Sequence, residues 1–220
     1  MKETYFEKIL RINTSKSETR MDNAKLYNRY EPTPYRALLT LFKHYEAKED
    51  DHFVDFGSGK GRFSFFVNYY YNSGCTGVEL VEEFHLKALA NLENYGKKNP
   101  SAKNKLFFVN DYAEKYTVSS FENKFYFFNP FALNIFISTV NKIIESVEEH
   151  ERVVDIILYY PSAEYINYLE KNTTFTHLMD IPLEITKDNY REKFVIYRFG
   201  NTFDILSEEY MKEYFIHPCK

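Results

Sequence analysis

The sequence predicts an α/β fold with a doubly wound, mostly parallel sheet and helices on both faces. Short apolar runs alternate along the chain with longer segments of helical periodicity, which is typical of parallel strands joined by helices. A turn with three alternate glycines follows the first of these runs, at a position where such folds bind ligands. Near the C-terminus two apolar runs follow one another directly, which indicates an antiparallel hairpin at one sheet edge.

The N-terminal segment, residues 1–30, is expected to form a helical arm, and residues 31–220 the folded domain. Apolar residues with helical spacing open the arm, namely Tyr5, Phe6, Ile9 and Leu10. The polar stretch "NTSKSETR" follows them. In the next segment, "EPTPYRALLTLFKHYEAKEDD", the sequence predicts a helix with Thr33 as its N-cap and Pro34 at its first helical position.

The remaining elements follow in alternation. Five runs suit strands buried on both faces of a sheet: 52–56, 75–80, 106–110, 124–128 and 153–160. Helical segments lie between them at about 61–72, 81–97, 132–149 and 162–171. The two runs of the expected hairpin are "THLMDIPL" and "KFVIYRFG".

Composition favours a soluble cytoplasmic protein. The net charge of −4 provides no overall positive field to attract nucleic acid. Cys75 and Cys219 are too few for a disulfide framework, and the histidines form no metal-binding pattern, so we expect no metal. The most apolar window, residues 125–140, is interrupted by polar residues and is too short to span a bilayer, so we expect no membrane association.

The glycine turn is the strongest functional signal in the chain. The run "HFVDF" leads into Gly57, Ser58, Gly59, Lys60 and Gly61, and a helical segment follows. Glycines at a strand-to-helix turn allow positive φ and let a ligand approach the backbone, while the helix N-terminus offers free N–H groups. The turn therefore predicts a nucleotide or nucleoside site at the end of the first strand.

Two acids narrow the choice of ligand. Asp55 ends the first strand, and Glu79 follows 24 positions later at the tip of the second, a spacing that suits an acid bound to both ribose hydroxyls. Arg62 occupies the place of the last glycine of the dinucleotide fingerprint G-x-G-x-x-G. The acids and the lack of a phosphate-binding lysine motif favour a cationic ligand without phosphate. We expect Lys60 and Arg62 to be solvated surface charges.

These motifs resemble those of the class I, Rossmann-like S-adenosylmethionine-dependent methyltransferases over roughly residues 30–200. "VDFGSGKGR" is similar to motif I of that family, "GVEL" to its acidic loop, "FVNDY" to its adenine segment and "FFNPF" to its motif IV. The resemblance implies a seven-strand sheet in the order 3-2-1-4-5-7-6 with strand 7 antiparallel. It also implies S-adenosylmethionine as the cofactor.

The resemblance further implies roles for individual residues. Asp55 and the turn would hold the methionine part, Glu79 the ribose, and Asp111 the adenine amine. The cofactor-binding set implied in this way is Asp55, Gly57, Ser58, Gly59, Gly61, Glu79, Leu80, Asp111 and Tyr112, with Leu80 and Tyr112 flanking the ring. Asp55 as an ordinary strand-end cap and Glu79 as a solvated acid are the alternatives.

The segment "KFYFFNPF" carries the catalytic candidates Asn129, Pro130 and Phe131. The Asn129 side chain and the Pro130 carbonyl can accept hydrogen bonds from a target amine, and Phe131 can pack on the target. "NPF" resembles the Asn/Asp-Pro-Pro-aromatic motif of amino-methyltransferases with one proline missing, and the Asn-Asn-Phe turn of non-SET histone lysine methyltransferases. A strand end that caps the next helix is the alternative.

Candidate lid or substrate residues lie before the first strand and after the fifth: Tyr30, Glu31, Thr33, Tyr35 and Tyr160. A simple helix entry is the alternative interpretation of the first four. The sequence thus indicates a methyltransferase acting on nitrogen, with protein lysine favoured over RNA or a small molecule. Outside this class the alternatives are a non-catalytic nucleoside-binding module and, third, a nucleotide-dependent oxidoreductase, against which Arg62 in place of the last glycine argues. The methyl acceptor and the oligomeric state do not follow from the sequence.

Overall fold

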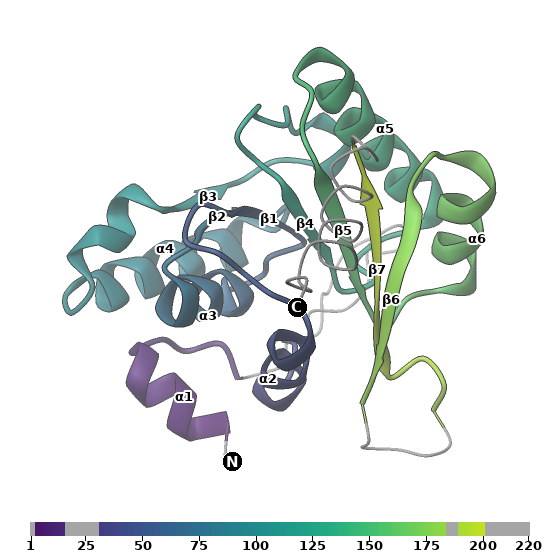
Figure 1. Ribbon diagram of the computed structural model, residues 1–220. Helices are drawn as coiled ribbons and strands as arrows, with labels where there is room; N and C mark the ends of the chain where they lie inside the picture. Colours follow the sequence, from purple (N-terminus) through teal and green to yellow (C-terminus); the bar gives the residue numbers. More distant parts are fainter. Residues whose placement is uncertain (1–2, 16–30, 184–188, 201–220) are drawn as a thin grey trace, which may run out of the picture.

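The computed structural model describes residues 3–15, 31–183 and 189–200. In this part of the chain a seven-stranded sheet has the order β3-β2-β1-β4-β5-β7-β6 (Figure 1). The strands are β1 (His52–Phe56), β2 (Gly74–Val78), β3 (Leu106–Val109), β4 (Lys124–Phe127), β5 (Val154–Tyr159), β6 (Thr176–Pro182) and β7 (Lys193–Phe199). β1 to β5 are parallel, whereas β7 is antiparallel to both of its neighbours. The expected order and the antiparallel seventh strand are confirmed.

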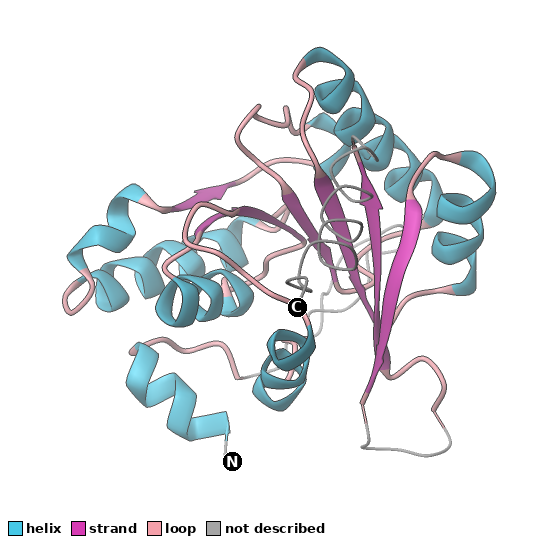
Figure 2. Ribbon diagram, viewed as in Figure 1, coloured by secondary structure: helices cyan, strands magenta, loops and turns pink. Residues whose placement is uncertain are grey.

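Helices cover both faces of the sheet (Figure 2). They are α1 (Glu3–Leu10), α2 (Tyr35–His44), α3 (Arg62–Tyr71), α4 (Glu82–Gly96), α5 (Leu133–Glu149) and α6 (Ala163–Asn172), with 3-10 turns η1 (Pro100–Asn104) and η2 (Ala113–Lys115). α3 to α6 connect successive parallel strands or lead into β6, as the alternation in the sequence predicts. Their bounds differ from the expected ones by one or two residues, the usual spread at helix ends.

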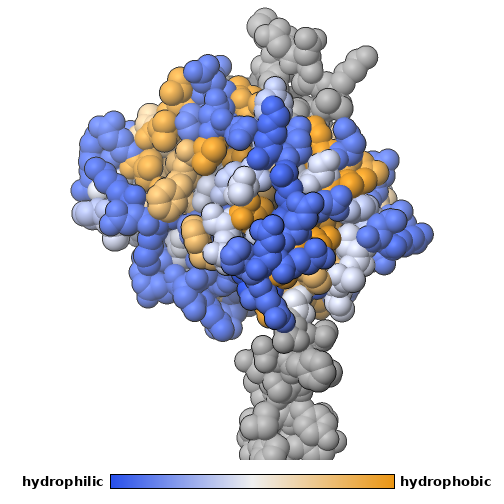
Figure 3. Space-filling model, turned by 90° about the horizontal axis from the view of Figure 1, so that it is seen from above, coloured by the Kyte–Doolittle hydropathy of each residue, from blue (hydrophilic) through white to orange (hydrophobic). Residues whose placement is uncertain are grey.

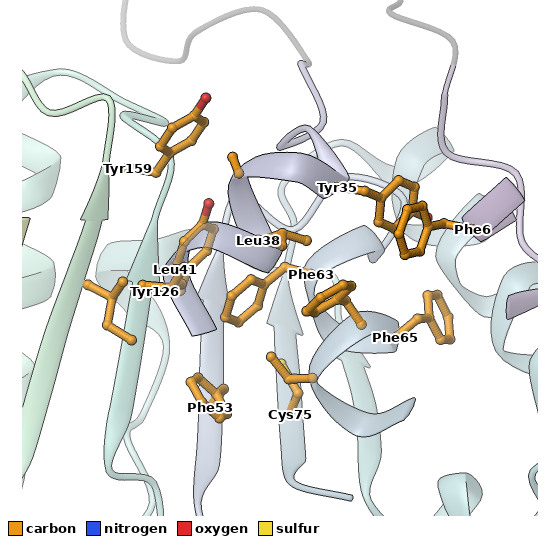
Figure 4. Close-up of a cluster of buried hydrophobic side chains, with 14 of the residues drawn as sticks. Phe6, Tyr35, Leu38, Leu41, Phe53, Phe63, Phe65, Cys75, Tyr126 and Tyr159 are labelled. Carbon is orange, nitrogen blue, oxygen red and sulfur yellow. The ribbon is translucent and has the colours of Figure 1, made fainter. Parts of the chain in front are cut away.

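Alternate residues of the central strands enter two separate cores. Phe53, Tyr126 and Ile157 pack with α1, α2 and α3, whereas Val54 and Phe127 pack with α5 and α6. This division follows from the strand itself, since successive side chains point to opposite faces of a sheet. Figure 4 shows the first core, with Phe53, Phe63 and Tyr126 between the strands and the helices.

The first helix is part of the first core. Phe6 and Leu10 of α1 are buried there, and the ring of Phe6 stacks on Tyr35 of α2 with centroids 4.5 Å apart (Figure 4). Helices of this length are marginal in isolation, so α1 depends on this packing for its stability. Residues 3–15 therefore contribute apolar surface to the same core as the sheet.

The start of α2 differs from the prediction. Pro34, rather than Thr33, occupies the N-cap position, with φ −58° and ψ 137°. The Thr33 hydroxyl does not cap the helix because it is engaged with the hydroxyl of Tyr126, 2.7 Å away on β4. The expected cap is therefore wrong, and the hydroxyl connects the helix entry to the sheet instead.

The surface mixes hydrophilic side chains with smaller groups of hydrophobic ones, as the face in Figure 3 shows. Several aromatic side chains are exposed, among them Tyr5, Tyr69, Phe107 and Phe121. No helix in the described part of the chain has the length and apolar character that a membrane span requires.

A buried carboxylate joins β4, β5 and β7. Asp155 accepts hydrogen bonds from Lys124 at 2.8 Å, from Arg198 at 2.7 and 2.9 Å, and from the Tyr45 hydroxyl. Burial alone would raise the pKa of the Asp155 carboxyl, but the Arg198 hydrogen bonds and the Lys124 charge outweigh it and hold that pKa below its ordinary value. The folded state therefore favours the ionised carboxylate.

Asp155→Asn should lower the free energy of unfolding by about 3 to 5 kcal/mol, because it leaves two partly buried cations without their shared anion. Urea unfolding at pH 7 measures the change. Asp180→Asn is the matched control, since Asp180 pairs with Lys193 at the surface, and should cost less than about 1 kcal/mol. Equal losses in the two variants would contradict the role given to Asp155. Because the folded pKa is lowered, the Asp155 contribution should disappear as the pH falls through that pKa.

Candidate functional site

A pocket opens where β1, β2, β3 and β4 end. It encloses, together with its mouth, about 810 Å³ of open space, a volume that includes open solvent. It lies beside the pair β1 and β4, where the strand order reverses and α/β sheets bind their ligands. Its lining comprises Glu31, Pro32, Thr33, Asp55, Gly57, Ser58, Arg62, Phe63, Val78, Glu79, Leu80, Val81, Phe84, Asp111, Ala113, Tyr126, Phe128, Pro130 and Phe131.

The glycine turn has the conformation that its sequence requires. Gly57 and Gly61 have φ values of 81° and 85°, which favour glycine. A Cβ on Gly57 would lie 2.8 Å from the Cβ of Pro130, and one on Gly61 would lie 2.7 Å from the ring of Phe108. Glycine at these two positions therefore allows the turn to approach both β3 and the segment after β4.

The backbone N–H groups of the turn are largely satisfied within the protein. Gly57 and Ser58 both donate to the carbonyl of Val78, at 2.9 and 3.1 Å, and Gly61 donates to the carbonyl of Ser58 at 2.9 Å. Gly59 donates to the carboxylate of Glu79 at 2.9 Å. A phosphate cradle presents such N–H groups to its ligand, so this turn is not arranged as one.

Glu79 joins the glycine turn to the loop after β2. Its carboxylate accepts from Gly59 N–H and, at 2.7 Å, from Val81 N–H, and the side chain is almost fully buried. The Asn110 amide, at the end of β3, donates to the carbonyls of Glu79 at 2.8 Å and Leu80 at 3.0 Å. The acid is therefore held in place at the pocket wall by backbone contacts.

Asp55 is a buried acid without a hydrogen bond to its carboxylate from any of the described residues. Burial, and then the charge of Glu79, raise the pKa of the Asp55 carboxyl to about 8. The side chain shares the sheet face of Phe53 and lines the pocket. A buried acid with a raised pKa in a pocket is typical of a functional site, and a cationic ligand would stabilise its ionised form.

Ser58 carries a second polar atom that lacks a partner. Its hydroxyl is buried at the pocket wall and has no hydrogen bond within the described residues. An additional Cβ on Gly77 would lie 2.7 Å from that hydroxyl, so β2 packs closely behind it. Because buried polar groups are normally paired, Ser58 is suited to bonding a ligand.

Arg62 and Lys60 are buried, so the expectation that they are solvated surface charges is wrong. The Arg62 guanidinium bonds Glu3 and, at 3.3 Å, Glu7 of α1. It also donates to the Thr14 hydroxyl at 2.7 Å and the Thr33 carbonyl at 3.1 Å. Sequence reasoning misplaced Arg62 because its acidic partners lie more than fifty positions earlier in the chain.

Aromatic side chains form the wall of the pocket near β4. The rings of Phe63 and Tyr126 stack with centroids 4.0 Å apart and 5° between their planes. Phe128 packs against Tyr159 with centroids 4.5 Å apart, and buried Phe131 is bonded through its backbone to the Tyr165 hydroxyl. The first pair is stacked and the second is tilted, and aromatic pairs at such distances contribute favourable contacts to the wall.

The structure brings together most of the residues singled out in the sequence. The pocket lining includes Asp55, Gly57, Ser58, Glu79, Leu80, Asp111, Thr33, Pro130 and Phe131, as well as Glu31. Gly59, Gly61, Tyr112, Asn129, Tyr35 and Tyr160 are not among the lining residues. Gly59 and Gly61 act through the shape of the turn, and Tyr30 lies outside the described residues.

The residues outside the lining have other contacts. Tyr35 is buried against Phe6, and its hydroxyl donates to Glu7 at 2.8 Å. Tyr112 is exposed beside Lys115, and Tyr160 packs under the Arg191 guanidinium. Asn129 and Tyr160 both have positive φ, 40° and 50°, which marks sharp turns at the ends of β4 and β5. Ala132, not Asn129 or Pro130, is the N-cap of α5.

Four aromatic lining residues were not among the candidates from the sequence: Phe63, Phe84, Tyr126 and Phe128. Phe63, Tyr126 and Phe128 lie within aromatic-rich stretches, and Phe84 lies in a helical segment with other apolar residues, so none of these rings can be told from a core residue in the sequence. The alternation of side chains along a strand could have identified Tyr126. It pairs with Asp55 of the neighbouring strand β1, so its side chain lies on the same face of the sheet as those of Asp55 and Phe53.

No protein-family model and no curated protein matches the sequence. Solved structures do match the fold. An RNA methyltransferase from Salinibacter ruber, in complex with S-adenosyl-L-homocysteine, matches with a TM-score of 0.53 and 16% identity over 77% of this chain and 93% of its own. The human methyltransferase 10 domain containing protein matches with a TM-score of 0.54 and 12% identity over 90% and 93%.

A third match is the precorrin-6y C5,15-methyltransferase from Geobacter metallireducens, with a TM-score of 0.53 and 14% identity over 84% of this chain and 93% of its own. Identities this low establish the fold and no more. Together with the strand order, they show that the chain has the class I methyltransferase fold.

The raised pKa of Asp55 predicts a stability that falls with pH. The unfolded state releases the Asp55 proton near pH 4 and the folded state near pH 8, so folding is progressively less favoured between them. Asp55→Asn removes this penalty. The variant minus wild-type free energy of unfolding should rise by up to about 1.4 kcal/mol per pH unit between the two pKa values and level off above pH 8.

Urea unfolding from pH 4 to pH 9 measures this difference, in which the titrating groups that do not interact with Asp55 cancel, whereas its coupling to Glu79 is included. Asp50→Asn, at an exposed aspartate, is the control and should give a flat difference. A flat profile for Asp55→Asn as well would show that the carboxyl is not held neutral by its surroundings.

Proposed function

We propose that this chain is an S-adenosylmethionine-dependent methyltransferase. The observation that carries the proposal is the charge of the pocket. Four lining residues are acids: Glu31, Asp55, Glu79 and Asp111. The lining also includes a cation, Arg62, but its charge is already compensated by ion pairs with Glu3 and Glu7. Such a pocket favours a ligand that carries positive charge and no phosphate.

The chemistry of the pocket fits the cofactor part by part. Asp55 would face its cationic end, and Ser58 offers a hydroxyl that has no partner within the described residues. Glu79 would accept hydrogen bonds from the ribose hydroxyls, and Asp111 from the adenine amine. The apolar lining of Leu80 and its neighbours would pack on the base. The cofactor, when bound, supplies an electrophilic methyl group on a sulfonium.

A dinucleotide fits the pocket less well. Its pyrophosphate needs free backbone N–H groups at the glycine turn, and the groups of Gly57, Ser58 and Gly59 are taken by Val78 and Glu79. It would also bring negative charge beside Asp55 and Glu79. A nucleotide-dependent oxidoreductase is therefore disfavoured. A module that binds the nucleoside without transferring methyl is the alternative.

For the methyl acceptor we propose a nitrogen presented at the aromatic wall near β4. The Pro130 carbonyl and the Asn129 amide would accept hydrogen bonds from the target N–H and orient its lone pair, which favours an in-line displacement. Pro130 lines the pocket and Asn129 does not, so the assignment depends more on Pro130. The preference for protein lysine has no support from the solved structures that match, which include an RNA methyltransferase and a precorrin methyltransferase.

Calorimetric titration with S-adenosylmethionine, S-adenosylhomocysteine and NAD tests the cofactor assignment. We expect both adenosyl ligands to bind and NAD to fail. Glu79→Gln preserves the shape of the side chain but removes its charge and one acceptor, so both affinities should fall at least tenfold. Thermal unfolding without ligand checks that the variant folds. Absence of adenosyl binding in the wild-type protein would overturn the proposal.

Asn129→Gly tests the catalytic assignment. Glycine tolerates the φ of 40° at this position, so the variant removes the side chain without straining the turn. Once an acceptor is found with labelled cofactor in lysate fractions, methyl transfer should slow at least tenfold while cofactor affinity is unchanged. Full activity would exclude a role for the Asn129 amide. Asn134→Gly, at an exposed position of α5, would reveal a loss unrelated to the pocket.

A further inference from the structure

A second hollow lies between α1, α3 and the segment after α4. Its lining residues are Tyr5, Lys8, Ile9, Tyr69, Lys98 and Asn99. We call it the tyrosine–lysine groove. No acid is among these residues, whereas four acids line the cofactor pocket. The two hollows therefore suit ligands of opposite charge.

The aromatic rings of the groove are open to solvent. Tyr5 is 53% exposed and Tyr69 is 43% exposed. Tyr70, 41% exposed, extends the same surface, since its ring lies 5.1 Å from that of Tyr69. Burial, and then the phenols of Tyr69 and Tyr5, raise the pKa of Tyr70, which is consistent with three rings close together. Exposed rings on neighbouring helices offer faces on which planar groups can stack.

The two lysines of the groove are available for an anion. Lys8 and Lys98 are exposed, and neither has an ion-pair partner among the described residues. By contrast, Lys87 pairs with Glu83 and Lys105 pairs with Glu49. An ammonium group without a partner gains more from a phosphate than one that must first leave a carboxylate.

We propose that the tyrosine–lysine groove binds single-stranded nucleic acid. Unpaired bases would stack on Tyr5 and Tyr69, and Lys8 and Lys98 would neutralise the neighbouring phosphates. Aromatic platforms combined with lysines are the recurrent solution for single strands, because every base has a stacking face. A duplex hides these faces, and a protein helix needs more aliphatic surface than Ile9 provides.

The groove is close to the cofactor pocket. Arg62 lines that pocket at the first position of α3, and Tyr69 follows seven residues later on the same helix. At 1.5 Å per residue the two positions are about 10 Å apart along the helix axis. A strand held in the groove would therefore lie near the pocket. The proposal concerns binding alone, so it can be tested without the cofactor and does not depend on methyl transfer.

Fluorescence anisotropy tests the proposal, with a labelled single-stranded oligoribonucleotide of about twelve nucleotides. An oligodeoxyribonucleotide of the same sequence, measured in parallel, tells RNA from DNA as the natural source. The protein is the full chain without cofactor. We expect binding that weakens as salt rises, and weaker competition from a duplex and from polyglutamate than from unlabelled single strand.

Two pairs of variants locate the site. Tyr5→Ala and Tyr69→Ala should each weaken binding at least fivefold, through the loss of one stacking platform. Lys8→Ala and Lys98→Ala should each reduce the slope of log affinity against log salt by about 0.7. The matched controls are Tyr190→Ala, at an 81% exposed tyrosine, and Lys171→Ala on α6, which should change neither quantity. Thermal unfolding checks the fold of each variant.

Three outcomes would overturn the proposal: no salt-dependent binding of either oligonucleotide, equal effects in groove and control variants, or equal competition by duplex or polyglutamate. The last would indicate attraction to charge without base stacking. Failure of the methyltransferase proposal would appear separately, as the absence of adenosyl binding in calorimetry.

Discussion

A guanidinium buried at the first turn of α3 needs several acceptors, and those that Arg62 finds come from separate parts of the chain. Two are carboxylates of α1, one is the Thr14 hydroxyl and one is the Thr33 carbonyl. The charge is stable there only while these partners surround it. Residues 3–15, the entry to α2 and the glycine turn are therefore coupled through one side chain that also lines the pocket.

Thr33 transmits this coupling to the sheet. Its carbonyl is held by Arg62, and its hydroxyl bonds Tyr126, whose ring stacks on Phe63 of α3. A buried network of this kind specifies one arrangement of the wall, because every polar member loses its partner if one of them moves. The aromatic wall of the pocket and the entry to α2 are thus parts of one connected structure.

Asp55 contrasts with Arg62, because the cost of burying its charge is not compensated by partners among the described residues. Its burial beside Glu79 makes the ionised form costly, which is why the pKa of its carboxyl is about 8. Asp155 is equally buried but is paired with Lys124 and Arg198, so the pKa of its carboxyl is below the ordinary value. Of these two buried aspartates, Asp155 is compensated by cations, whereas Asp55 faces the pocket with a raised pKa, an arrangement that is typical of functional sites.

Much of the fold could be predicted from the sequence, because the signals for it are local. Apolar runs, helical periodicity and the glycines of residues 57–61 each depend on neighbours within a few positions. The places of Asp55, Glu79 and Asp111 at one edge follow once the runs are taken as parallel strands, whereas the order of the strands was implied by the resemblance to the class I methyltransferases. The roles assigned to these residues remain predictions.

Contacts between distant parts of the chain could not be predicted in this way. Arg62 and Lys60 were predicted to be surface charges, because nothing near them in the sequence indicates that they are buried. Thr33 was predicted to be a helix cap, because its actual partner, the Tyr126 hydroxyl, lies 93 positions away in the sequence. The groove between α1 and α3 likewise depends on a packing contact, the burial of Phe6, that brings Tyr5 beside Tyr69. Local pattern determines which elements form, whereas tertiary packing determines which polar side chains are enclosed and with which partners.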